Sequence, residues 1–178
     1  GEIAFHGKYN TGAQDYAYLG HIRGIKENAT AGNTACALTF HTRPNATAPQ
    51  ERLRIASDGR VYIGNTQDSS PYSWNLGLQV SGTSTNAGLS IRRDQSGSGG
   101  ALLMFVKTGG SLNGNTAPSD DDQIGGIYFN AADGTDVNNV AANIAAFVDG
   151  TPGSNDTPGR LEFKTTADGA NSPTERLR

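Results

Sequence analysis

Short apolar segments with a β-strand pattern recur along the chain. Leu161-Glu162-Phe163 has the two-residue period of a strand with one buried face. Ile3-Ala4-Phe5 is rich in strand-forming residues. Residues 52–55 and 61–64 flank Ser57-Asp58-Gly59-Arg60, the pattern of two strands joined by an Asp-Gly turn. These patterns predict an all-β chain built from short strands and tight turns.

Polar stretches rich in Gly, Ser, Asn, Thr and Asp separate the predicted strands. We expect loops at residues 64–75, 81–88, 94–100 and 108–122. The glycine-rich part of the third loop precedes the apolar run 101–106, which we expect to be a strand. A phosphate-binding loop needs a following helix N-terminus and usually a lysine, so none is assigned here.

Blocks of sequence recur at a spacing of about 124 residues, which indicates an internal repeat. The matched blocks are 1–7 with 125–131, 38–42 with 161–165, 49–54 with 173–178 and, less securely, 22–24 with 148–150. The Ala-rich segment 137–146 fits either a helix or a strand; its counterpart beginning at Tyr18 favours a strand.

The repeat predicts three parts of the chain. Residues 1–64 form the end portion of one unit, 65–124 the loop-rich start of the next, and 125–178 the truncated end portion of that unit. Because both ends fall inside a unit, we expect the chain to be a segment of a longer repetitive array.

Composition limits how large a core one chain can bury. Ile, Leu, Val and Phe make up only 32 of 178 residues, and 17% of residues are charged, with a net charge of -3. We therefore expect copies of the chain to pool their apolar side chains along a common axis. The expected packing residues are Ile3, Phe5, Phe40, Leu53, Ile55, Val61, Ile63, Ile127, Phe129, Leu161 and Phe163.

Charge and hydropathy disfavour several classes of function. The 14 basic residues are scattered, without the stripe that a nucleic-acid interface usually shows. The longest apolar run, 101–106, is far too short to span a membrane, so membrane insertion is not expected. A single cysteine, Cys36, excludes an internal disulfide, and we expect it to be a small buried residue.

One segment resembles a known family. The run ERLRIASDGRVYIG at residues 51–64, followed by Pro71 and by LQVSG at 78–82, resembles the signature of bacteriophage tail-fibre and tailspike stalks. The same signature occurs in shafts that end in an endosialidase-type intramolecular chaperone. Residues 124–129 and 160–165 look like companion segments of those repeats. This chain has Tyr62 where the family pattern usually has glycine.

The resemblance implies an elongated homotrimeric β-rich fibre shaft, with intertwined or stacked short β-sheets around a threefold axis. The implied function is a structural shaft segment, located extracellularly on the virion, that positions a receptor-binding tip for host attachment. No catalysis and no cofactor are expected. Two alternatives stay open: a polysaccharide-degrading tailspike body, and a bacterial surface adhesin or extracellular filament repeat.

Neither acidic nor histidine residues form a convincing metal site. Asp120-Asp121-Asp122 lacks the regular spacing of a calcium loop, so a solvated loop before a strand is favoured. His6, His21 and His41 are widely spaced, although a β-array can stack them. The second copy has Asn130 opposite His6 and Lys164 opposite His41, which disfavours a metal site that the shaft requires.

Glu51 and Glu175 occupy equivalent repeat positions beside Arg52 and Arg176. A recurring acid next to a recurring base favours a structural ion pair, within a chain or between chains, over a catalytic role.

Aromatic residues gather at two places and are the candidates for binding a host cell-surface glycan by stacking. Tyr72 and Trp74, the only tryptophan, lie in the predicted loop 64–75. The alternative is that Trp74 packs on the shaft and anchors this loop. Tyr9, Tyr16 and Tyr18 form the second cluster, in a loop and strand near the N-terminus.

Overall fold

The computed structural model describes residues 1–9, 16–83 and 87–178. It divides the chain into two compact units, Gly1–Ser90 and Ile91–Arg178. Both units are built from open β-sheets, so the all-β prediction is confirmed.

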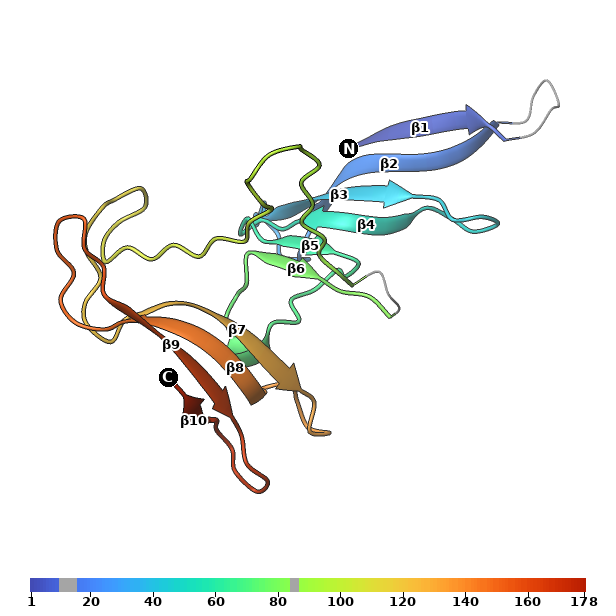
Figure 1. Cartoon of the computed structure of the whole chain (residues 1–178). Coiled ribbons are helices and arrows are strands. Elements are labelled where there is room, and N and C mark those ends of the chain that lie inside the picture. Colours follow the sequence, from blue (N-terminus) through green and yellow to red (C-terminus); the bar gives the residue numbers. More distant parts are fainter. Residues whose placement is uncertain (10–15, 84–86) are drawn as a thin grey trace. The chain divides into compact units, whose positions relative to one another are not determined.

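The first unit is a six-stranded sheet whose strands lie in chain order (Figure 1). Neighbouring strands are antiparallel except for the last pair, which is parallel. A short 3₁₀ turn, η1, covers Pro71–Ser73 between the last two strands. The strands are β1 (Glu2–Lys8), β2 (Tyr16–Lys26), β3 (Cys36–Thr42), β4 (Gln50–Ile55), β5 (Val61–Ile63) and β6 (Leu78–Val80).

The predicted hairpin around the Asp-Gly turn is confirmed. Leu53 of β4 pairs with Ile63 of β5. At the turn, the Ala56 amide donates to the Arg60 carbonyl at 2.9 Å. Gly59 has a φ of 85°, a left-handed conformation that glycine adopts without a Cβ penalty. The residues of the turn therefore suffice to explain how this hairpin forms.

The second unit is a four-stranded sheet, again with antiparallel neighbours in chain order. Its strands are β7 (Gln123–Ala131), β8 (Asn139–Val148), β9 (Gly159–Thr165) and β10 (Thr174–Leu177). The segment 137–146, for which a strand was favoured over a helix, contributes most of β8, so that prediction is confirmed.

Cross-strand register relates the two sheets position by position. Ile3 pairs with Ile22 in the first unit, and Ile127 pairs with Ile144 in the second. The sequence match of residues 22–24 with 148–150 is therefore wrong, because in register Ile22 corresponds to Ile144. Both hairpins also carry a β-bulge at the same place, directly after Phe5 and directly after Phe129.

Two local predictions are wrong. Residues 101–106 form no strand within the described chain, because no other strand of their unit pairs with them. Cys36 is exposed rather than buried, since it is the first residue of β3, at the end of the sheet. The loops predicted at 64–75, 94–100 and 108–122 contain no strand; residues 84–86 of the loop 81–88 lie outside the described residues.

Candidate functional site

The first unit has an exposed apolar face. Because side chains alternate along a strand, residues two apart share a face of the sheet. Cross-strand pairing aligns six apolar residues in one row: Ile3, Ile22, Phe40, Leu53, Ile63 and Val80. Phe5, Leu38, Ile55, Val61 and Leu78 lie on the same face by alternation. Ile3 remains 63% exposed, Phe5 51% and Leu78 56%.

The opposite, largely polar face of this sheet is the better covered one. Thr39, Arg54, Tyr62 and Gln79 follow one another in a cross-strand row, in which Thr39, Tyr62 and Gln79 are buried. The Gln79 side chain accepts a hydrogen bond from the Ser69 amide at 2.9 Å and donates to Asp68 at 2.8 Å. Long polar side chains therefore cover their own face, whereas Ile3, Phe5 and Leu78 on the apolar face stay about half exposed or more.

The second unit shows the same arrangement. Ile127, Ile144, Phe163 and Leu177 form one cross-strand row. Phe129 and Leu161 share this face, and both are about half exposed. On the opposite face Glu162 is buried, together with Asn143 and Ala145. We define the apolar face of each unit by these two rows and their alternating neighbours.

Residues 88–107 lie in the sequence between β6 and β7 and join no strand in the described chain. Leu89, Leu102, Met104 and Val106 expose more than 70% of their surface. Phe105 approaches β7 so closely that a Cβ placed at Gly125 would lie 2.6 Å from the Phe105 Cβ. Residues 88–107 therefore carry exposed apolar side chains in addition to those of the two apolar faces.

The recurring glutamates form ion pairs, with partners other than the adjacent arginines. Glu51 accepts two hydrogen bonds from Arg54, at 2.7 and 2.9 Å. Arg52 instead lies in the bulge of β4 and donates to the Thr42 hydroxyl at 3.1 Å.

The second unit repeats this pattern. Arg178 lies 3.7 Å from Glu175, and Arg176 donates to Thr165 at 2.8 Å. The predicted structural ion pair exists within one chain in both units, but it joins residues three apart, because the bulge turns the adjacent arginine toward the neighbouring strand.

Histidines of the first sheet stack on its polar face. The ring centroids of His21 and His41 are 4.0 Å apart, and Tyr18 stacks between His21 and His6. Among the described residues neither ring nitrogen of buried His21 has a hydrogen-bond partner. Burial and the neighbouring His21 lower the pKa of His41, against the opposing influence of Glu51. These rings form a stacked packing layer on the polar face.

The aspartate run forms a turn directly before β7, as expected, and its carboxylates are used within the chain. Asp121 lies 2.8 Å from the Arg160 guanidinium. Asp120 accepts a hydrogen bond from the Gly150 amide at 2.6 Å. Asp122 accepts from the Ser119 amide at 3.0 Å. These interactions account for the acidic cluster without a metal ion.

Tyr72 and Trp74, the predicted glycan-binding pair, lie together on the loop between β5 and β6. Their ring centroids are 5.3 Å apart, and Trp74 is 53% exposed. The loop is fixed by Asp68, which contacts Arg60 and accepts from the Ser70 amide at 2.8 Å. The hydrogen bonds to Ser70 and Gln79 lower the pKa of Asp68. Polar contacts thus hold the loop, and Trp74 stacks mainly on its neighbour.

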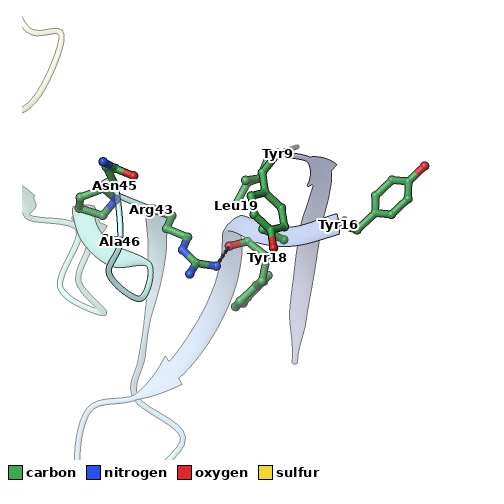
Figure 2. Close-up of a pocket in the computed structure, with 9 residues that line it drawn as sticks. Tyr9, Tyr16, Tyr18, Leu19, Arg43, Asn45 and Ala46 are labelled. Carbon is green, nitrogen blue, oxygen red and sulfur yellow. Dashed lines mark hydrogen bonds between the residues drawn. The ribbon is translucent and has the colours of Figure 1, made fainter. Parts of the chain in front are cut away.

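A pocket of about 540 Å³ opens beside the other aromatic cluster. Its lining includes Tyr9, Tyr16, Tyr18, Leu19, Arg43 and Asn45. Figure 2 shows the Arg43 side chain reaching the Tyr18 backbone carbonyl, to which it donates at 3.3 Å, and Tyr16 pointing outward.

The sequence indicated the tyrosines of this pocket but not Arg43 or Asn45. Both follow β3, and only strand pairing brings them beside β2: the Arg43 amide donates to the Leu19 carbonyl at 2.8 Å. No local motif could have placed them there.

Within the described residues, no three His, Cys, Asp or Glu side chains gather in a way that could hold a metal ion. Over the same residues, no helix has the length and apolar character needed to cross a membrane.

Comparison with solved structures identifies a fold of the same kind. The carboxy-terminal domain of the bacteriophage T5 L-shaped tail fibre superposes with a TM-score of 0.70. The fold resembles that of a phage tail-fibre domain. The similarity covers 99% of this chain and 74% of that one, at 14% sequence identity. No protein-family model and no curated protein sequence matches this chain.

Proposed function

We propose that this chain is a structural segment of the shaft of a phage tail fibre. Three copies associate side by side through their apolar faces and form an elongated homotrimer on the virion. The shaft carries and orients a receptor-binding tip, and the segment itself catalyses no reaction.

The exposed apolar faces carry this proposal. A soluble monomer rarely exposes contiguous apolar patches larger than a few hundred Å². Here Ile3, Phe5 and Leu78 in one unit, and Ile127 and Phe129 in the other, are about half exposed or more. Copies that meet through these faces would bury them and supply the core that one chain lacks.

The fold similarity supports the tail-fibre setting. The segment 51–64, which resembles the tail-fibre signature, folds as β4, the Gly59 turn and β5. It contributes Leu53 and Ile63 to the apolar row. The residues that carry the sequence resemblance therefore include residues of the proposed trimer interface.

Residues 88–107 fit the same assembly. An extended segment outside any strand leaves backbone donors and acceptors available for another chain. In the proposed trimer this segment lies against neighbouring copies, which cover Leu102, Met104 and Val106.

Sedimentation velocity on the intact chain tests the proposal, because it measures mass and shape together. We expect a mass of about three chains and a high frictional ratio. A compact monomer at micromolar concentration would contradict the trimer.

A pair of variants tests whether the apolar face is the interface. Phe129→Asp places a charge on the apolar face, whereas Leu112→Asp places one on a loop side chain that is 92% exposed. We expect the first variant to sediment as a monomer and the second as the trimer. Trimers for both variants would rule out Phe129 as part of the interface.

A further inference from the structure

The pocket between β2 and the segment after β3 combines aromatic rings, a cation and an amide. We propose that it binds a sugar ring that carries a carboxylate, as found in acidic cell-surface polysaccharides. This goes beyond the proposed structural role. The described lining residues belong to the first unit of one chain, so the test can be made on the chain whatever its state of association.

The tyrosines supply the surface on which a sugar ring packs. Tyr9 and Tyr16 are 67% and 63% exposed, although each ring is large and mostly apolar. The Tyr18 ring is already held in the stack between His6 and His21, so it belongs to the wall of the pocket. Tyr9 is therefore the ring that we assign to the sugar. Rings of this kind bury considerable apolar area and keep a hydroxyl for a polar contact.

Arg43 supplies the charge that selects an acidic sugar. One of its terminal nitrogens donates to the Tyr18 carbonyl, which orients the guanidinium toward the pocket. Among the described residues it makes no ion pair, and the described lining contains no carboxylate. An arginine presents five donors in a planar fork that matches a carboxylate. A bound carboxylate would supply an anionic partner for Arg43, which has none among the described residues.

Asn45 adds an amide that both donates and accepts, as sugar hydroxyl groups require. A volume of about 540 Å³ lies within the range of small-molecule pockets, roughly 300–1,000 Å³. The combination of an apolar ring, one cation and one amide differs from that at Tyr72 and Trp74, where the two rings stack on each other and form none of the described pocket lining.

The test compares D-glucuronic acid with D-glucose, which differ only in the carboxylate at C6. Saturation-transfer difference NMR on the intact chain measures transfer from the protein to the sugar-ring protons. We expect transfer to glucuronic acid and at least fivefold less transfer to glucose. Equal transfer to the two sugars, or none to either, would overturn the proposal.

Variants locate the binding. Arg43→Gln removes the charge, and Tyr9→Ala removes the ring; both side chains are exposed, so we expect the fold to persist by circular dichroism. Each should weaken glucuronic acid binding roughly tenfold. Arg92→Gln is the matched control, since it removes an exposed arginine that is not part of the described pocket lining, and it should leave binding unchanged.

Loss of binding in Arg92→Gln, or unchanged binding in Arg43→Gln, would contradict the proposal, because the sugar would then not depend specifically on Arg43. Sedimentation of the same samples separates the two hypotheses, since a monomeric chain that still binds glucuronic acid contradicts only the trimer.

Discussion

The imidazole rings of His21 and His41 stack face to face, with 4.0 Å between their centroids and 19° between their planes. Both lie on the polar face of the first sheet, directly opposite each other on β2 and β3. Burial and the neighbouring His21 lower the pKa of His41, which disfavours a charge on the His41 ring. Arg23 and Arg54 disfavour it further, and Glu51, 3.8 Å from His41, is the opposing anion.

This stack predicts a loss of stability in mild acid. The pKa of His41 is lowered in the folded chain, so the unfolded chain binds the proton more readily. Above about pH 6.5, the unfolded pKa, His41 is neutral in both states and does not affect stability. As the pH falls below that value, protonation favours the unfolded chain and the free energy of unfolding decreases. Thermal melts between pH 5 and 8 measure this slope.

His41→Gln keeps a polar side chain that does not titrate, and we expect it to flatten the slope between pH 5 and 7. His6→Gln is the control at the exposed end of the stack and should retain it. A slope that His41→Gln leaves unchanged would show that other groups cause it.

Glu162 predicts a second, more acidic transition. Hydrogen bonds from Lys164 and Arg160 lower the pKa of Glu162 to about 2. Its stabilisation is therefore complete above the unfolded pKa of about 4.3 and is lost as the pH falls toward 2. We expect Glu162→Gln to lower Tm by roughly 2–4 °C at pH 7, for a loss of about 1 kcal/mol.

Glu175→Gln is the matched control, since Glu175 is 41% exposed and pairs with Arg178 alone among the described residues. Its melting temperature should stay within about 1 °C of the parent chain, as is usual for exposed ion pairs. If both substitutions changed Tm by the same amount, the ion pairs of Glu162 would stabilise the fold no more than an exposed ion pair does.

The end of β5 depends on a glycine. Gly64 has a φ of 77°, and a Cβ there would overlap the carbonyl oxygen of Ser81. The Ser81 amide donates to the Ile63 carbonyl at 2.8 Å, so this contact extends the pairing of β5 and β6. We expect Gly64→Ala to destabilise the first unit by about 1–3 kcal/mol.

Gly77→Ala tests whether this effect is specific. A Cβ at Gly77, just before β6, meets nothing within 4 Å. Chemical denaturation should give the Gly77→Ala chain a stability within about 1 kcal/mol of the parent. If both substitutions lowered the free energy of unfolding equally, the close approach of Ser81 to Gly64 would not be the reason that residue 64 must be glycine.

Asp68 controls the loop that carries Tyr72 and Trp74. Asp68→Asn removes the charge that pairs with Arg60 and weakens the hydrogen bonds to Ser70 and Gln79. Trp74 is the only tryptophan, so its fluorescence anisotropy reports on this loop alone. We expect anisotropy to fall in Asp68→Asn. Asp94→Asn, which alters an exposed ion pair with Arg92, should have no effect; a fall in both would argue against the loop contacts.

The strands could be predicted because their signals are local. Alternation at Leu161-Glu162-Phe163 and the Asp58-Gly59 turn each determine structure within a few residues. Alternation separates two faces of a strand, but it does not say which face the chain covers by itself. Burial of His21, Thr39 and Glu162 beside an exposed apolar face therefore followed only from the structure.

The candidate site was only half predictable for a similar reason. Tyr9, Tyr16 and Tyr18 are near one another in sequence, whereas Arg43 reaches Tyr18 across the pairing of β2 and β3. The apolar run 101–106 was predicted as a strand on composition alone. Composition does not supply the hydrogen-bonding neighbour that a strand requires.

The exposed apolar faces also bear on when assembly takes place. In the proposed trimer the apolar faces are buried only after copies of the chain meet, so each newly translated chain would first present these faces to any other chain. Under that proposal, ordered association would compete with precipitation, and the outcome would depend on how soon a chain meets two other copies. Copies synthesised close together on one messenger RNA would win that competition more often than copies released separately into a dilute solution.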